Sequence, residues 1–265
     1  MSIFEAVVIA IVEGLTEFLP ISSTGHMIIT SSILDISTDP FTKLFEVAIQ
    51  FGAILSVVVL YWKKFFPFNR FNFYLKLIVA VIPALALGTL FSDRIDALLE
   101  SSLTVSVTML AGGFILLFID RLFKQPAIEK EESVSLMKAI TIGVWQCLAM
   151  IPGTSRSAAS IIGGMQQKLT RNLAAEFSFF LAVPTMAAAT GYKLLKAWKE
   201  NPELLQNKEN LIALGVGNVV AFIVALLAIK FFIGFLQKHG FRLFGWYRVI
   251  VGAVLLALVL AGYLK

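Results

Sequence analysis

Apolar runs separated by short charged loops follow one another along almost the whole chain. An α-helix needs about 20 apolar residues to cross about 30 Å of hydrocarbon. Six runs have this length, at residues 43–62, 72–91, 103–122, 174–198, 211–235 and 245–264. Because the loops between them are small, the pattern predicts a single all-α integral membrane domain over residues 1–265, with six full transmembrane helices.

Two further apolar regions are interrupted by polar residues. Residues 1–36 are broken at LPISSTG and residues 135–167 at IPGTSRS, where proline, glycine and hydroxyl residues end a helix. Each region is predicted to form two half-helices around a bend. Irregular backbone at membrane depth is tolerated only where protein or a water-filled cavity satisfies its N–H and C=O groups. We therefore expect two re-entrant helical hairpins whose bends face inward.

Positive charges give the chain a preferred orientation. If residues 1–42 enter the membrane from outside, most lysines and arginines fall on the inside, Lys238, Arg242 and Arg248 among them. The loop at 193–208, with four lysines, is the exception. The bias favours this orientation, which puts the first hairpin on the outside and the second on the inside.

The two halves of the chain follow the same plan. Each hairpin is followed by a span that opens with a polar stretch and an acid, Glu46 in the first half and Glu176 in the second. A pattern repeated with opposite sidedness is typical of an inverted-topology duplication, whose site lies near the midplane between the repeats. We predict repeats at about residues 1–125 and 135–265 on this basis.

Composition supports the membrane prediction and excludes other classes. The chain is 58% hydrophobic and 15% charged, with a mean hydropathy of +0.86, which is too apolar for a soluble domain of this size. The net charge of +5 comes from residues at the ends of apolar runs, so we predict no nucleic-acid partner. Cys147 is the only cysteine, which excludes an internal disulfide. The glycine pairs at 112–113 and 163–164 are interpreted as surfaces for close helix packing.

Two acids precede the first bend. Glu13 and Glu17 are four residues apart, so their carboxylates share one helix face and repel each other if both are ionised in a poorly solvated place. A shared proton or a cation must resolve this repulsion. A hard divalent cation such as Mg²⁺, which takes oxygen ligands, is the simplest solution and makes both acids candidate metal ligands. The alternative is a pair of acids at a watery mouth or bonded to nearby backbone.

Hydroxyls and a histidine follow on the first bend and the returning half-helix. Ser22 and Ser23 stand at a predicted helix start, where free N–H groups and the helix dipole favour an anion. Ser23 and His26 are three apart and are candidates for nucleophile and base, or His26 acts alone. A capping serine beside an incidental histidine is the alternative.

The second bend contains a cation. Arg156 has no acidic residue within twenty positions on either side except Glu176 at the limit, so we expect a partner far along the chain. Its planar donors suit phosphate oxygens, and hydroxyls surround it at Thr154, Ser155, Ser157 and Ser160. The alternative is an arginine satisfied by carbonyls of the broken helix, or by Glu13 or Glu17.

These residues together resemble the undecaprenyl-diphosphate phosphatase family of the bacitracin-resistance type. The first family motif, an acid or Gln and then a Glu with three residues between them, is matched by Glu13-Gly-Leu-Thr-Glu17, followed by the serine-rich bend and His26. The second, PGxSRSxxT, is matched from Pro152 to Ser160. The last position is Ser instead of Thr, which keeps a hydroxyl. The resemblance extends over nearly the whole chain.

The resemblance implies removal of the terminal phosphate from undecaprenyl diphosphate, a polyprenyl diphosphate, in recycling the carrier lipid of bacterial cell-wall synthesis. It also implies bacitracin resistance, a divalent cation (Mg²⁺ or Ca²⁺), and a multi-pass protein of the bacterial plasma membrane whose site faces the outer side. The predicted catalytic residues are Glu17, Ser23, His26 and Arg156. The predicted phosphate-binding residues are Ser22, Thr154, Ser155, Arg156, Ser157 and Ser160, and the metal ligands are Glu13 and Glu17. Since neither bend is a complete phosphatase site alone, we expect Glu17 and Arg156 to lie close together.

Several alternatives stay open at this point. The attacking group is Ser23, His26 or water, and a homodimer is possible. Acid-phosphatase-like lipid phosphatases are set aside, because their chemistry requires a second histidine motif and His239 lies in a loop without one. A transporter or flippase for an anionic prenyl lipid is the rival function, since inverted repeats with broken helices are typical of transporters.

Overall fold

The structure is a computed structural model that describes residues 1–67, 70–91, 98 and 101–264. Within these residues it is helical, with one isolated bridge between Ile128 and Leu169 and no strand. Six of its helical segments are long and apolar enough to cross a membrane. The predicted all-α class and the six predicted spans are therefore confirmed.

The six spans begin and end within a few residues of the predicted positions. The first is formed by α3 (Pro40–Ala48) and α4 (Gln50–Leu60) together. The others are α6 (Phe71–Leu90), α8 (Ser102–Leu122), α11 (Arg171–Glu200), α13 (Lys208–His239) and α14 (Arg242–Leu260). Short helical turns lie between them at α5 (Trp62–Phe65), η1 (Glu131–Ser133) and α12 (Glu203–Gln206).

Polar residues between the apolar runs start the helices. The side chains of Asp39, Ser101, Thr170 and Asn207 each accept a hydrogen bond from a backbone N–H in the first turn of the helix that follows. Such caps satisfy donors that the helix itself leaves free. The break between α3 and α4 was not predicted; it lies where the Thr190 hydroxyl donates to the Val47 carbonyl at 3.1 Å.

Both interrupted regions form two half-helices around a bend, as predicted. The first consists of α1 (Ile3–Thr16) and α2 (Ser23–Ile33), and the second of α9 (Leu136–Gln146), the 3₁₀ turn η2 (Cys147–Met150) and α10 (Arg156–Gln166). The second helix of each pair follows a serine at positive φ, 72° at Ser22 and 73° at Ser155. In each case the serine hydroxyl accepts from the backbone N–H three residues later, at 3.3 Å.

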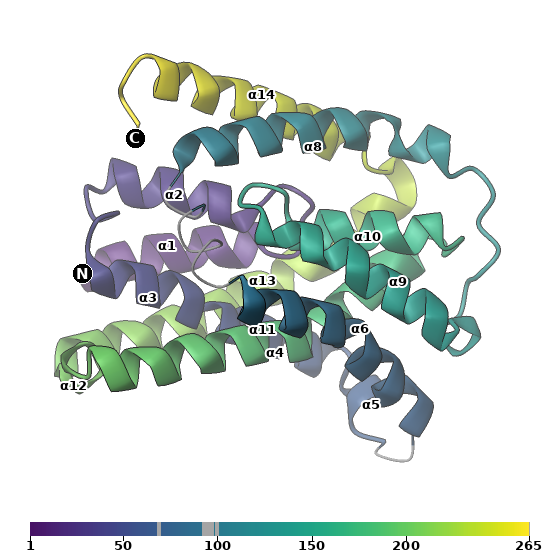
Figure 1. Ribbon diagram of the computed structural model, residues 1–265, viewed down its shortest axis with the longest axis horizontal. Helices are drawn as coiled ribbons and strands as arrows, with labels where there is room; N and C mark the ends of the chain where they lie inside the picture. The colour runs from purple at the N-terminus through teal and green to yellow at the C-terminus, as the bar shows by residue number, and fades with distance from the viewer. Residues whose placement is uncertain (68–69, 92–97, 99–100, 265) are drawn as a thin grey trace.

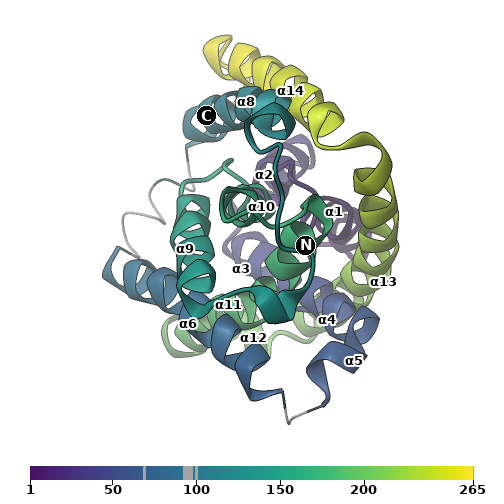
Figure 2. The ribbon, with the colours of Figure 1, turned by 90° about the vertical axis from the view of Figure 1, so that its right-hand side faces the viewer.

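Three of the four half-helices, α1, α2 and α10, lie inside a ring of other helices, to which the fourth half-helix, α9, belongs (Figures 1 and 2). In Figure 2, α1, α2 and α10 occupy the middle, with α8 and α14 above, α13 on one side, α6 and α9 on the other, and α4 and α11 below. Within the ring α1 packs along α13, α9 packs along α6, and α8 packs along α14. The bends are buried: Ser22 is 2% exposed and Ser155 is 8% exposed. The prediction that the bends face inward is confirmed.

Small residues allow the helices to approach closely. A side chain at Gly113 would meet the Val249 backbone, and one at Gly163 would meet the Trp145 side chain. This confirms the interpretation of both glycine pairs as packing surfaces. At the crossing of α4 and α13 the Gly52 N–H also donates to the Asn218 side chain at 2.7 Å.

Candidate active site

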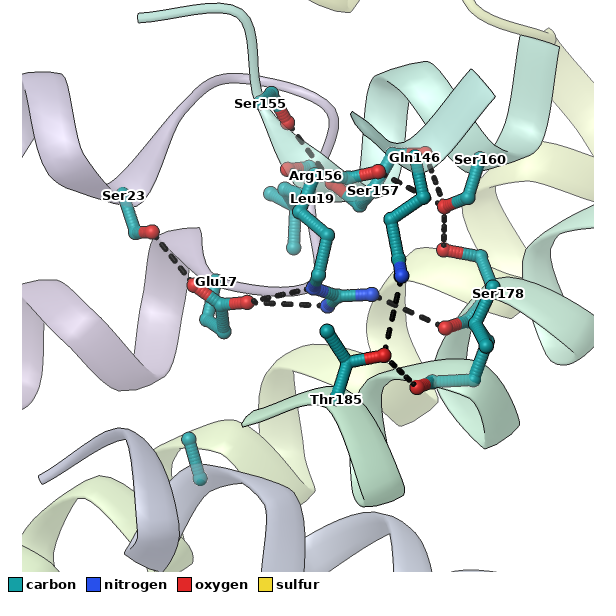
Figure 3. Close-up of polar contacts among 12 residues, drawn as sticks. Glu17, Leu19, Ser23, Gln146, Ser155, Arg156, Ser157, Ser160, Ser178 and Thr185 are labelled. Carbon is teal, nitrogen blue, oxygen red and sulfur yellow. Dashed lines mark hydrogen bonds and ion pairs between the residues drawn. The ribbon is translucent and has the colours of Figure 1, made fainter. Parts of the chain in front are cut away.

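Two residues from opposite halves of the chain form an ion pair at the centre of the fold (Figure 3). Glu17 is the C-cap residue of α1, and Arg156 begins α10. The Nε and Nη2 of Arg156 donate to Glu17 Oε1 at 3.1 and 3.0 Å. The partner of Arg156 is therefore distant in sequence, and the predicted closeness of Glu17 and Arg156 is confirmed. Their side chains are only 6% and 11% exposed, so water screens the attraction little.

Arg156 retains donors that this ion pair does not use. Its Nη1 donates to the Ser178 carbonyl at 3.0 Å, and the guanidinium lies over the Phe18 ring at 5.8 Å. A guanidinium has five N–H donors, and its contacts with the described residues use three, so two remain there for another acceptor. The structure therefore agrees with the alternative in part, because Glu17 and a carbonyl do bind the guanidinium. The two remaining donors, which bind none of the described residues, are still free to bind an anion.

The other oxygen of the Glu17 carboxylate holds Ser23. The Ser23 hydroxyl donates to Glu17 Oε2 at 2.6 Å (Figure 3). A hydroxyl bonded to a carboxylate has the geometry of a nucleophile beside its base. The pairing of Ser23 with His26, which the three-residue spacing allowed, is not found in the structure.

Both ring nitrogens of His26 have other partners. Nδ1 lies 2.7 Å from the Ser22 carbonyl, and Nε2 lies 2.6 Å from the Tyr247 hydroxyl of α14. Because a carbonyl only accepts, Nδ1 carries a hydrogen, and in the neutral ring Nε2 then accepts from the Tyr247 hydroxyl. The two rings also stack, with centroids 5.5 Å apart. Sequence analysis did not find Tyr247, because nothing local in the last span indicates a contact 221 residues away.

The hydroxyls of the second bend bond mainly within the protein. The Ser157 hydroxyl donates to the Leu19 carbonyl at 2.8 Å, and the Ser155 hydroxyl lies 3.0 Å from the Ser157 hydroxyl. Ser160 bonds the Arg156 carbonyl at 2.8 Å and the Ser178 hydroxyl at 2.6 Å. Ser157 and Ser160 are fully buried, and Thr154 is half-buried. The Ser157 hydroxyl fixes the second bend to the first, and the Ser160 hydroxyl fixes α10 to α11. The predicted contact of these hydroxyls with phosphate stays a prediction.

Glu13 is the least satisfied polar group near the ion pair. It is fully buried one helical turn before Glu17, and neither of its carboxylate oxygens has a hydrogen-bond partner among the described residues. The same holds for Oε1 of Glu46. Within that part of the chain no group of three or more His, Cys, Asp or Glu side chains is placed to hold a metal. The free oxygens of Glu13 suit Mg²⁺, which takes one or two protein carboxylates and completes its shell with water and substrate phosphate. Both oxygens of Glu17 already accept hydrogen bonds, so Glu17 can bind a cation only through its remaining lone pairs.

Arg248 on α14 lies at the bends, although from the sequence it was counted among the positive charges of the inner side. It is fully buried, and its guanidinium donates to carbonyls of both bends. One arginine near the start of an apolar run resembles a topology signal in sequence. Only the fold shows that the residue points inward.

The chain was also compared with known proteins. Residues 6–254 match the family model described as bacitracin resistance protein BacA. A protein named undecaprenyl-diphosphatase from Flavobacterium johnsoniae is 57% identical over 257 residues, which cover 97% of this chain and 96% of that protein. Proteins of the same name from Porphyromonas gingivalis and Campylobacter jejuni are 52% and 46% identical, covering 99% and 98% of this chain and 98% and 96% of their own lengths.

Proposed function

This chain belongs to the bacitracin resistance protein BacA family, and we propose that it is an undecaprenyl-diphosphatase of the bacterial plasma membrane. The proposed reaction hydrolyses the terminal phosphate of a polyprenyl diphosphate and leaves the monophosphate carrier lipid for cell-wall synthesis. The observation that carries the proposal is the Glu17 carboxylate, which binds Arg156 through one oxygen and Ser23 through the other. The guanidinium and the hydroxyl are thereby each held within one hydrogen-bond length of the carboxylate.

The contacts of Glu17 suggest how the groups divide the work. Arg156 binds phosphoryl oxygens with its two remaining donors and stabilises the charge that grows on them. Glu17 accepts the proton of the attacking hydroxyl. In the covalent route Ser23 Oγ bonds to the terminal phosphorus, the bond from that phosphorus to the bridging oxygen breaks, and water then hydrolyses the phosphoserine. In the direct route Glu17 takes the proton of a water instead, and Ser23 orients it.

Trapping distinguishes the two routes. Rapid acid quench of the enzyme with ³²P-labelled prenyl diphosphate leaves label on protein only in the covalent route, and Ser23→Ala abolishes that label. His26 is bonded at both nitrogens, so a role as acid for the leaving oxygen requires it to exchange one partner. His26→Asn tests this role through its effect on the rate for substrates with different leaving groups.

We further propose that Glu13 and Glu17 hold a divalent cation, Mg²⁺ or Ca²⁺. The two unpartnered, fully buried oxygens of Glu13 support this assignment. Such a cation would supply positive charge beside the diphosphate, and this charge would offset the repulsion between the diphosphate and the two acids. Glu17 orients the ion pair and the hydroxyl whether or not the cation is bound.

The membrane arrangement is proposed as two re-entrant hairpins in an inverted repeat, with the site open to the outer side. The matching serines at positive φ, Ser22 and Ser155, support the repeat. So does the exchange of partners, since α1 of the first half packs on α13 of the second while α9 packs on α6. Labelling of Ser37→Cys and Asn69→Cys in a protein without Cys147 tests sidedness: Ser37 is expected to react from outside and Asn69, which lies outside the described residues, from inside.

Phosphate release from purified protein tests the function. Wild type is assayed with a prenyl diphosphate in EDTA and with added Mg²⁺ or Ca²⁺, beside Glu17→Ala, Arg156→Ala and the exposed-acid control Glu200→Ala. We expect release by wild type and control and its loss in both site variants. Undiminished release by both site variants contradicts the site. Movement of labelled lipid between leaflets without phosphate release favours the rival transporter, for which the broken helices are the supporting feature.

A further inference from the structure

The side chain with the most hydrogen bonds at the bends belongs to Arg248, a residue that has no chemical role in the proposed reaction. Arg248 is 0% exposed, and among the described residues no acid forms an ion pair with it. Its five donor contacts all go to backbone carbonyls, those of Pro20, Thr108, Met109, Gly153 and Thr154, at 2.8 to 3.2 Å. A buried arginine is costly, so an arginine with this complete a carbonyl shell indicates a specific role.

The five carbonyls come from three separate segments. Pro20 belongs to the first bend, Gly153 and Thr154 to the second, and the remaining two to α8. Nη1 alone joins the two bends, since it donates to Pro20 at 3.2 Å and to Thr154 at 2.9 Å. Arg248 is thus the side chain that fixes the distance between the bends from the side of α14.

In both bends, the carbonyls that Arg248 binds lie a few residues before the reacting groups in the chain. Thr154 precedes Ser155, and Pro20 stands two residues before Ser22, the two serines at positive φ. L-residues adopt that conformation at a cost, so surrounding contacts must hold it. Ser23 and Arg156 come next in the chain and meet at Glu17. A shift of the guanidinium therefore changes where hydroxyl and cation meet the carboxylate.

The packing around Arg248 is shaped for arginine. A methyl group at Gly112 would overlap its guanidinium, and one at Gly113 would overlap its Cβ and the Val249 backbone. The Thr108 hydroxyl also donates to the Pro152 carbonyl, so α8 supports the second bend from the same side. A lysine keeps the charge, but its single ammonium cannot span carbonyls that a planar fork reaches.

We propose that Arg248 is a positioning residue that holds the two bends at the separation in which Ser23 and Arg156 both reach Glu17. The expected effect on kcat rests on the proposed diphosphatase function. The expected effect on the separation of the bends rests on the contacts of Arg248 alone. Arg248 acts through the bends and makes no contact with substrate. The proposal predicts a loss of turnover more than a loss of substrate affinity.

The test compares two perturbations of the guanidinium with two matched controls. Arg248→Lys keeps the charge, and Gly112→Ala keeps the arginine but displaces it. The controls are Arg242→Lys, an exposed arginine on the same helix, and Gly215→Ala, where an added methyl meets nothing within 4 Å. Purified full-length proteins are assayed with farnesyl diphosphate for kcat and KM per folded molecule, and hydrogen exchange is followed in both bends.

Both perturbing variants are expected to lower kcat about 100-fold, because a small misplacement of reacting groups costs that much, with KM changed less than about threefold. Exchange should rise in both bends together and stay unchanged where α6 meets α9. Arg242→Lys and Gly215→Ala should match wild type. If Arg248→Lys does not fold, Gly112→Ala decides, and failure of both to fold reduces Arg248 to a stability element and overturns the proposal.

Other outcomes separate this inference from the function on which it rests. Unchanged kcat per folded molecule, or a KM effect alone, overturns the positioning role. If wild type and controls release no phosphate, the diphosphatase proposal fails, and the exchange measurement still tests whether Arg248 holds the bends.

Discussion

The substitution Glu17→Gln tests the centre of the proposed site with the smallest change of shape. The carboxylate accepts three hydrogen bonds, two from Arg156 and one from Ser23, at 2.6 to 3.1 Å. Glutamine keeps one oxygen for the guanidinium but replaces the acceptor facing Ser23 with an N–H₂ group, so the serine loses its base. Loss of a general base lowers the rate by about 10²- to 10⁴-fold, or about 3–5 kcal/mol of transition-state stabilisation.

The effect on stability should be smaller than the effect on rate. Arg156 retains the Ser178 carbonyl and the glutamine oxygen, so its charge does not become isolated. The loss of charge assistance in these hydrogen bonds is worth about 1–3 kcal/mol of unfolding free energy, discounted by the slight exposure of both partners. Full isolation of a buried charge would cost about 3–5 kcal/mol.

Steady-state kinetics and thermal unfolding in the same detergent separate the two effects. The control, Glu200→Gln, neutralises an exposed acid at the end of α11 and should leave kcat and unfolding unchanged. A folded Glu17→Gln protein with at least half of wild-type kcat would refute the assignment of Glu17 as base. So would a loss of activity fully explained by a smaller folded fraction.

Three further predictions follow from other contacts. Tyr247→Phe removes the hydroxyl that bonds His26 but keeps the stacked ring, so kcat should fall by less than about tenfold. An equal fall for substrates with every leaving group would exclude a role of the His26–Tyr247 pair in protonating the leaving oxygen. Glu13→Gln should raise the Mg²⁺ concentration for half-maximal activity at least about tenfold without loss of folded protein. EDTA should inactivate the wild type reversibly. Activity that does not depend on a metal would rule out Glu13 as a metal ligand. Gly52→Ala forces a methyl against the Asn218 backbone and should destabilise the fold by about 1–3 kcal/mol in denaturant unfolding, whereas Gly215→Ala should not.

The spans and the broken helices were predictable because their signals are local. A run long enough to cross a membrane is visible in any window of the sequence, and so is a proline beside glycine and hydroxyls within such a run. The partner of Arg156 was predictable only to the extent that local acids were missing. The contacts of Tyr247 and Arg248 were not predictable, because each depends on how α14 packs against the bends, and one sequence contains no measure of that packing.

The two bends show why one carboxylate serves a site built from both halves of the chain. Each bend ends in a serine at positive φ, and the next residue, Ser23 or Arg156, reaches Glu17 from its own side. Equivalent backbone positions therefore hold a hydroxyl in one half and a cation in the other. Two serines there would leave the phosphoryl charge without a guanidinium, and two arginines would leave Glu17 without a hydroxyl to deprotonate. In the proposed inverted repeat, a difference at this one position on a similar backbone geometry is sufficient to make the halves complementary. The proposed activity then depends on the contacts that fix the separation of the bends, those of Arg248 first of all.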